Sequence, residues 1–106
     1  MQQGLKLRES RIRKFIIEIL LALDCIHDLK IVHRDLKPSN IFIKGKNLEI
    51  KIGDFGISKM MSGKSISNCN MGTLCYSSPE VVQRREYDQR TDIWSLGCVI
   101  FELCTY

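Results

Sequence analysis

The side chains with the clearest chemical potential lie in residues 33–40, a polar stretch between two apolar runs. Its sequence is His-Arg-Asp-Leu-Lys-Pro-Ser-Asn. Any one of these residues alone would be typical of a solvated turn, but together they place a carboxylate (Asp35), an ammonium group (Lys37) and an amide (Asn40) close together in the chain. A carboxylate can accept a proton from a hydroxyl group, and an amide oxygen can bind a hard cation. We therefore interpret the polar stretch as a site rather than as part of a core.

A second carboxylate follows at Asp54, in the Asp-Phe-Gly tripeptide of residues 54–56. Taken alone, this tripeptide is typical of a turn. Its position shortly after the polar stretch makes it more specific, because a carboxylate and an amide oxygen on facing loops can hold Mg²⁺ and neutralise charge on phosphate groups. The two segments together predict that Asp54 and Asn40 bind magnesium. Asp35 would then orient an attacking hydroxyl group, and Lys37 would offset charge on a transferred phosphoryl group.

The element before the polar stretch is predicted to be a helix. Apolar residues recur at spacings of three and four between residues 12 and 26, which is one helical face. Ser10 could cap the start of this helix, and the helix should end near residues 28–30. Further apolar side chains widen the stripe, so we expect the helix to be substantially buried. These are Phe15, Leu20 and Leu21.

Short strands are predicted on both sides of the polar stretch. Residues 31–32 should form a strand that leads into it, and Pro38 excludes an ordinary helix through it. Residues 41–43 and 48–52 predict two strands joined by the turn chemistry of Gly-Lys-Asn. This hairpin would carry the polar stretch on one side and residues 53–56 on the other, which brings the two acidic segments close together.

The second half of the chain predicts a loop followed by two helices. Residues 58–70 are rich in Ser, Gly, Asn and Lys and show little periodicity, as in a loop. Pro79 can begin a short helix that continues over residues 81–84. Residues 92–103 are apolar nearly all round, which predicts a helix buried within a larger domain.

Composition and charge exclude several classes of protein. A chain of 106 residues is one domain at most, and 44% hydrophobic with 26% charged residues is an ordinary globular composition. The net charge of +4 comes from 16 basic and 12 acidic residues, and no aromatic residues interleave with a dense basic cluster. We therefore expect no nucleic-acid partner.

The cysteines and the apolar runs indicate the compartment. Five cysteines form no C-x-x-C pair, and their spacings with His27 and His33 resemble no zinc framework. We find no secretory leader at Met1, so free thiols in a reducing compartment are expected. The apolar, uncharged run of residues 93–101 is far short of the roughly 20 residues that cross a bilayer. We expect a cytoplasmic protein without a membrane partner, with a nuclear or cytoskeleton-associated location as the alternative.

Four motifs in this order resemble those of the eukaryotic protein kinase domain. The polar stretch is similar to the catalytic loop H-R-D-L-x-x-x-N, and residues 54–56 match D-F-G. Residues 72–80, Gly-Thr-Leu-Cys-Tyr-Ser-Ser-Pro-Glu, are similar to G-T-x-x-Y-x-x-P-E, with Ser78 where the A-P-E pattern has alanine. The fourth motif is Asp-Ile-Trp-Ser-Leu-Gly, residues 92–97. The resemblance covers the chain from about residue 10 onward.

The resemblance is most specific to the serine/threonine class. Lys37 and Thr73 together resemble that class rather than the tyrosine class. Within it, the chain is most similar to the NIMA-related kinases, judged from residues 40–43, 51–56 and 92–105. The fold implied is α+β and protein-kinase-like: residues 1–106 would be a partial kinase domain, a mainly helical C-lobe portion with a small β-hairpin. The N-lobe would be absent, because the chain has no G-x-G-x-x-G loop and no V-A-I-K-type lysine.

The implied activity is that of a protein serine/threonine kinase segment, which transfers the γ-phosphoryl group of ATP to Ser or Thr hydroxyls of a protein substrate. ATP and Mg²⁺ would be the cofactors. By resemblance, Asp35 is the base, Lys37 contacts the phosphate, and Asn40 and Asp54 are the magnesium ligands. The resemblance also implies one contact with ATP and one with the protein substrate. These are Phe42 as the floor of the adenine pocket and Thr73 in the peptide-binding platform.

Other residues have implied supporting roles. His33 and Phe55 would stack in the hydrophobic spine. Plain core packing is the alternative, and the two explanations are compatible because a spine residue is a core residue. Arg34 would pair with a phosphate on the loop after residue 58, and Asp92 would anchor the backbone of the catalytic loop. Glu80 would pair with an arginine that this sequence does not contain.

The loop after residue 58 departs from the family pattern. Cys69 stands at the position of the usual phosphorylated threonine, which puts switching by phosphorylation in doubt. Ser65 and Ser67 are neighbouring candidate phosphosites, and ordinary loop composition is the alternative explanation for both. Two alternatives to the kinase function are also open. The chain could be a truncated, catalytically inactive kinase remnant that acts as a binding module and exposes apolar surface, or a non-functional fragment that does not fold.

Overall fold

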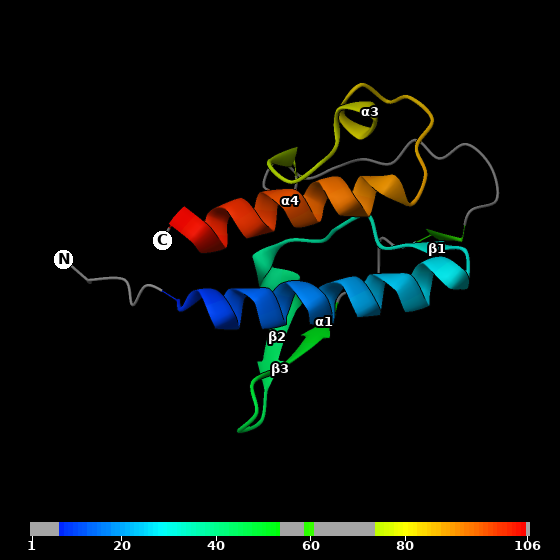
Figure 1. Ribbon diagram of the computed structural model, residues 1–106. Helices are drawn as coiled ribbons and strands as arrows, with labels where there is room; N and C mark the ends of the chain where they lie inside the picture. Colours follow the sequence, from blue (N-terminus) through cyan, green and yellow to red (C-terminus); the bar gives the residue numbers. More distant parts are fainter. Residues whose placement is uncertain (1–6, 54–58, 61–73, 106) are drawn as a thin grey trace.

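The computed structural model describes residues 7–53, 59–60 and 74–105. Two long helices lie side by side, and a β-hairpin extends from the far side of the first helix (Figure 1). In chain order the elements are α1 (Glu9–Asp28), β1 (Ile31–Val32), the 3₁₀ helix η1 (Pro38–Asn40), β2 (Ile41–Lys44), β3 (Glu49–Ile52), β4 (Lys59–Met60), α3 (Pro79–Val82) and α4 (Arg90–Thr105). Helices and short antiparallel strands therefore combine in an α+β arrangement, as the sequence predicts.

Helix α1 is buried along one narrow stripe. Its buried residues, Phe15, Ile19 and Leu23, recur every four residues and so lie on one face. The prediction that Leu20 and Leu21 widen this stripe is wrong, because they are 42% and 60% exposed. They follow Ile19 by about 100° and 200° around the helix, which turns them away from the described core.

The start of α1 also differs from the prediction. The helix begins at Glu9, and Arg8 is the N-cap in an extended conformation without a side-chain cap. The carbonyl of Arg8 accepts the backbone N–H groups of Arg11 and Ile12 at 2.9 and 3.1 Å. Ser10 therefore lies inside the first turn and does not cap it. Glu9 suits this end of the helix, because a carboxylate is favoured near the positive end of the helix dipole.

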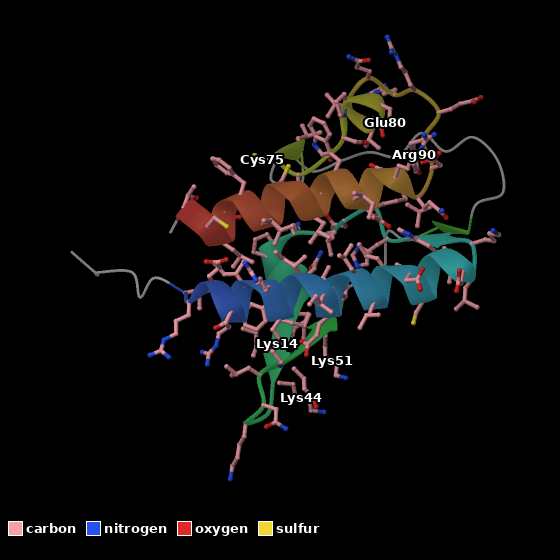
Figure 2. The ribbon with its side chains drawn as sticks, in the orientation of Figure 1. Lys14, Lys44, Lys51, Cys75, Glu80 and Arg90 are labelled. Carbon is pink, nitrogen blue, oxygen red and sulfur yellow. The ribbon has the colours of Figure 1, made fainter. Side chains whose placement is uncertain are left out.

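The hairpin is joined to α1 by two polar side chains. Lys14 Nζ donates to the carbonyl oxygens of Asn47 and Leu48 at 2.8 and 3.3 Å, and Glu18 Oε2 accepts the N–H of Ile50 at 2.8 Å. The Ile50 N–H, followed by Lys14, lowers the pKa of Glu18. Figure 2 shows Lys14 of α1 beside the hairpin that carries Lys44 and Lys51. These contacts fix the hairpin to the helix on which the core is built.

The hairpin pairs β2 with β3 in the register Ile41 to Ile52 and Ile43 to Ile50. Three of these isoleucines, Ile41, Ile50 and Ile52, pack against the central cluster of Ile19, Leu23, Leu36 and Leu96. Both predicted strands are confirmed, although the second begins at Glu49. The preceding Leu48 has φ +54° and belongs to the turn, which opens with Gly45 at φ +73°. Glycine suits that position because it tolerates positive φ without a steric penalty.

The two remaining strands, β1 and β4, pair with each other where the chain enters the polar stretch. β1 pairs antiparallel with β4, with Ile31 opposite Met60 and Val32 opposite Lys59. The strand that enters the polar stretch is thereby tied to backbone beyond the Asp-Phe-Gly tripeptide. This pairing is absent from the sequence-based prediction, because two-residue strands carry no measurable periodicity.

Helix α4 is buried on one side only. Asp92, Leu96 and Val99 are buried, whereas Trp94 is 50% and Phe101 71% exposed. The prediction of a helix here is confirmed, but burial all round does not hold in the described part of the chain. Helix α1 packs along one face of α4, and the polar stretch contacts its first turn. In the described ranges, no helix combines the length and apolar character that crossing a membrane requires.

Candidate active site

The polar stretch crosses between the two long helices, from the end of β1 to the start of β2 (Figure 1). Pro38 begins the single 3₁₀ turn that ends at Asn40, in keeping with the prediction that it excludes an ordinary helix. Leu36 is fully buried in the central cluster, which pins the middle of the stretch to the core. The polar residues on either side of Leu36 are therefore held by packing as well as by hydrogen bonds.

Asp35 and Asn40 form the centre of the site. The Asn40 amide Nδ2 donates to the Asp35 carbonyl oxygen at 2.6 Å and to Asp35 Oδ2 at 3.1 Å. Both residues are about 95% buried. The other carboxylate oxygen, Asp35 Oδ1, accepts no hydrogen bond within the described part of the chain, and Lys37 Nζ lies 3.6 Å from it as an ion pair. A buried acceptor without a donor is costly, so Oδ1 is poised to accept a proton or a hydroxyl hydrogen bond.

The orientation of Asn40 leaves an oxygen donor available. Because Nδ2 faces two oxygen atoms of Asp35, the amide oxygen points elsewhere, and no hydrogen bond to it is found among the described residues. An amide oxygen is a ligand type that hard cations such as Mg²⁺ accept. The amide oxygen of Asn40 is therefore chemically suited to bind a magnesium ion.

His33 connects the polar stretch to Gly53, the last residue of its segment that the structure describes. The backbone N–H of Asp35 donates to His33 Nδ1 at 3.1 Å, which makes Nδ1 an acceptor. The proton must then be on Nε2, which lies 2.8 Å from the carbonyl oxygen of Gly53. The ring is fully buried. A neutral imidazole with one defined tautomer thus holds Asp35 and residue 53 at a set separation.

Asp92 supports the stretch from α4. Its Oδ2 accepts the backbone N–H of His33 at 2.9 Å and contacts His27 Nε2 at 2.8 Å, and its Oδ1 accepts the backbone N–H of Arg34 at 2.9 Å. The carboxylate is fully buried, and these donors offset the cost of removing its charge from water. Its position in the first turn of α4 is also favoured by the helix dipole.

Arg34 has a strained backbone, and the hydrogen bond from its N–H group to Asp92 helps to maintain that conformation. Its φ is +71°, in the left-handed region, where a non-glycine residue costs about 1 to 2 kcal/mol. The guanidinium carbon of Arg34 lies 5.4 Å from the ring centroid of Tyr87, in a cation–π contact. Both the backbone and the side chain of Arg34 are therefore engaged by residues at the start of α4 or just before it.

Phe42 lies on the outer face of the hairpin, opposite Lys51, and is 53% exposed. Its ring covers Gly53: a Cβ atom at residue 53 would lie 2.6 Å from Phe42 Cε2. Glycine is therefore needed at this position for the ring to remain where it is. The exposed ring offers a flat apolar surface over Gly53, whose carbonyl oxygen lies 2.8 Å from His33 Nε2.

The segment before α3 is fastened to α4 by hydroxyl groups. Ser78 Oγ and Thr91 Oγ1 are 2.6 Å apart and both residues are buried. Ser95 Oγ donates to the Tyr76 carbonyl oxygen at 2.6 Å, and Tyr76 donates its phenolic proton to Glu102 Oε2 at 2.7 Å. The hydrogen bond to Glu102 raises the pKa of Tyr76 to about 12.

Sequence reasoning did not identify these partners. The signal available was Ser78 itself, because a serine in place of the alanine of the A-P-E pattern brings a hydroxyl group that needs a partner when buried. The sequence offers many hydroxyl groups, and only the fold selects Thr91.

Glu80 is half-buried at the start of α3. The pKa of the nearby Arg90 is raised mainly by its hydrogen bond to Asp88, and Glu80 is the smallest of the causes that raise it. Figure 2 shows Glu80 and Arg90 in the same region, where α3 leads into α4. Arg90 is chiefly paired with Asp88, at 2.7 to 3.0 Å.

Some predicted site residues lie outside the described ranges. The structure brings together His33, Arg34, Asp35, Lys37, Asn40 and Asp92, and places Phe42 beside Gly53. Asp54, Phe55, Ser65, Ser67, Cys69 and Thr73 are outside the described ranges. Within residues 7–53 and 74–105, no group of three or more His, Cys, Asp or Glu side chains could hold a metal ion. Of the two predicted magnesium ligands, Asn40 is the one that lies within the described ranges.

The whole sequence, residues 1–106, matches the family model described as "Protein kinase domain". The chain belongs to the protein kinase family, and the predicted fold class is confirmed.

Individual relatives are NIMA-related serine/threonine kinases. The chain is 44% identical over 105 residues to serine/threonine-protein kinase Nek5 of Homo sapiens, covering 98% of this chain and 15% of that protein. It is 46% identical over 99 residues to serine/threonine-protein kinase Nek8 of Danio rerio, covering 93% and 14%. It is 45% identical over 95 residues to serine/threonine-protein kinase nekl-2 of Caenorhabditis elegans, covering 90% and 27%. The predicted resemblance to this group is confirmed, and the chain spans about a seventh to a quarter of these relatives.

Proposed function

We propose that the full-length protein containing this chain transfers the γ-phosphoryl group of ATP to serine or threonine hydroxyls of protein substrates. The observation that carries the proposal is the state of Asp35. Its carboxylate is buried, one oxygen is bound by Asn40, and the other faces Lys37 without a hydrogen bond in the described ranges. A substrate hydroxyl group could supply the missing donor. Its proton would pass to Asp35 as the hydroxyl oxygen bonds to the γ-phosphorus, the bond from that phosphorus to the β–γ bridging oxygen breaks, and ADP leaves.

The other groups of the site fit the charges of that reaction. Lys37 lies 3.6 Å from Asp35 Oδ1 and can offset negative charge on the phosphoryl group in transfer. Asn40 and Asp54 would hold Mg²⁺, which when bound neutralises the charge of the ATP phosphates. Phe42 would contact the adenine ring with its exposed face. Thr73 would take part in the platform for the substrate peptide.

The proposal is tested by Asp35→Asn in the full-length protein, with a matched control. Asp24→Asn makes the same chemical change at an exposed position of α1. We expect Asp35→Asn to lower kcat by about 100-fold or more, as loss of a positioned base does, while the Kd for Mg²⁺-ATP stays within about twofold. Asp24→Asn should retain full activity. Wild-type protein without transfer activity, or an active Asp35→Asn variant, would refute the proposal.

A second candidate is a catalytically inactive kinase remnant that binds other proteins. Exposed apolar side chains on the two long helices favour it, among them Leu21 at 60% and Phe101 at 71%. A thermal melt of the 106-residue chain with and without Mg²⁺-ATP separates the candidates. A cooperative transition that rises with Mg²⁺-ATP supports a nucleotide site in this chain. A transition indifferent to nucleotide favours the remnant, and no transition means that these residues fold only with additional protein.

We place the proposed activity in the cytoplasm, with the nucleus or the cytoskeleton as alternative locations. The cysteines at residues 25, 75, 98 and 104 are free thiols. Free thiols persist in reducing compartments. Fluorescence microscopy of the tagged full-length protein, together with fractionation, would test this location.

A further inference from the structure

We propose that Tyr87 is a positioning residue for Asp35, acting through the side chain of Arg34. The inference rests on the proposed kinase function and adds a residue to that site. Tyr87 is half-buried in the connection between α3 and α4, and its ring lies under the guanidinium group of Arg34 at 5.4 Å. Arg34 directly precedes Asp35, so whatever holds Arg34 also acts on the direction of the Asp35 carboxylate.

The backbone conformation of Arg34 explains why the contact of its side chain with Tyr87 affects the position of Asp35. A φ of +71° is unfavourable for arginine, and the residue would relax to negative φ if it were released. That change would turn the peptide group between Arg34 and Asp35. The Arg34 N–H bond to Asp92 and the Asp35 N–H bond to His33 Nδ1 depend on the present orientation of this backbone. A contact that holds the Arg34 side chain opposes the relaxation.

Tyr87 is itself fixed to the helix that carries Asp92. The next residue, Asp88, accepts the Arg90 backbone N–H through its side chain at 2.9 Å and the Thr91 N–H through its carbonyl at 3.1 Å. The first turn of α4 and the residues just before it are therefore one hydrogen-bonded unit. This unit contacts Arg34 twice, by the Asp92 carboxylate on the backbone and by the Tyr87 ring on the side chain. The two contacts together restrain both the backbone and the side chain of Arg34.

The test compares substitutions that keep or remove the aromatic face in the full-length protein. Tyr87→Phe keeps the ring, whereas Tyr87→Leu keeps apolar bulk without a π face. Gln83→Ala is the control, since Gln83 is exposed in the same connection. For each variant we would measure kcat per folded molecule, KM for ATP, Kd for Mg²⁺-ATP and Tm. We expect Tyr87→Leu to lower kcat about two- to fivefold, the range of a single cation–π contact, with KM for ATP unchanged and only a small fall in Tm. Tyr87→Phe and Gln83→Ala should match the wild type.

The coupling to Arg34 is tested by a double variant. Arg34→Met should lower kcat, and adding Tyr87→Leu to it should lower kcat no further, because both changes remove the same contact. Independent, multiplying losses would overturn the proposal. So would wild-type kcat in Tyr87→Leu, or an equal loss in Tyr87→Phe.

Failure of a variant to fold and absence of activity in the wild type have different meanings. Should Tyr87→Leu not fold, Tyr87→Met carries the same test, because methionine adapts to irregular space. If neither variant folds, Tyr87 supports the fold rather than Asp35, and the proposal is overturned. Absence of transfer activity in the wild type would instead refute the kinase function itself. An active wild type with unaffected Tyr87 variants would refute only the positioning role.

Discussion

Asp92 Oδ1 accepts the backbone N–H of Arg34 at 2.9 Å, although 58 residues separate the two in the chain. The bond joins the first turn of α4 to the residue before Asp35, and it holds a backbone that would otherwise relax. The site is thus built from the contact between two distant segments and not from the polar stretch alone.

The first prediction concerns this buried carboxylate. Asp92→Asn replaces one accepting oxygen by an NH₂ group that cannot accept a backbone N–H, so at least one buried donor loses its partner. We expect the free energy of unfolding of the part of the full-length protein that contains Asp92 to fall by about 2 to 4 kcal/mol, measured by urea denaturation. Asp24→Asn, at an exposed position, should change it by less than about 0.5 kcal/mol. Equal stability of the two variants would contradict the role of Asp92.

The second prediction concerns the hydroxyl pair of Ser78 and Thr91. Ser78→Ala should cost about 1 kcal/mol of unfolding free energy, because the buried Thr91 hydroxyl then loses its 2.6 Å partner. Thr91→Val should cost a similar amount. The double variant should be more stable than the sum of the two losses predicts, since neither unpaired hydroxyl group remains. Strict additivity in the urea-denaturation cycle would show that the two hydroxyl groups do not interact.

The third prediction concerns pH and Tyr76. Its pKa is raised from 10.0 to about 12 by the hydrogen bond to Glu102. The bond requires the protonated phenol, so its stabilising effect is fully present below pH 10 and is lost as the pH rises towards about 12. Titration of ¹³C-labelled tyrosine by NMR should give this pKa, and Glu102→Gln should move it back towards the ordinary value. Tyr76→Phe identifies the signal, and a Tyr76 pKa insensitive to Glu102→Gln would refute the assignment.

The fourth prediction concerns Gly53 and the exposed ring of Phe42. Gly53→Ala would place a Cβ atom 2.6 Å from the ring, which must move aside. Because Phe42 is half-exposed and can rotate, we expect a stability loss of only about 1 kcal/mol. Under the proposed function, the affinity of the full-length protein for ATP should fall severalfold, measured by isothermal titration calorimetry.

Gly97→Ala is the matched control for that experiment. It makes the same substitution within α4, where, apart from the adjacent residues and the helix's own backbone, no atom of the described residues lies within 4 Å of the new Cβ. It should keep ATP affinity and raise stability by up to about 1 kcal/mol, as replacing a helical glycine does. If Gly53→Ala binds ATP as tightly as the wild type, Phe42 is not the floor of the adenine pocket.

Several local elements follow directly from the sequence. The three- and four-residue spacing in α1, the alternation in residues 48–52 and the prolines at 38 and 79 predict elements that the structure contains. Local periodicity and fixed proline φ act within a few residues, so they need no knowledge of the fold. The exposure of Leu20 and Leu21, by contrast, was predicted wrongly, because burial depends on what packs against a face and not on the face alone.

The amino-acid sequence by itself determined the family, the local elements and the chemical groups of the site, because motif order and residue type are properties of the chain. Only the tertiary structure decided which atoms remain available. It assigned the Asn40 NH₂ group to Asp35, the His33 proton to Nε2 and the Ser78 hydroxyl to Thr91, and it left Asp35 Oδ1 without a hydrogen bond in the described ranges. Those choices depend on distances between segments that lie 2 to 20 residues apart in the chain. Hydrogen bonds form only within about 3 Å, and the packing of α1, α4 and the hairpin is what brings such segments that close.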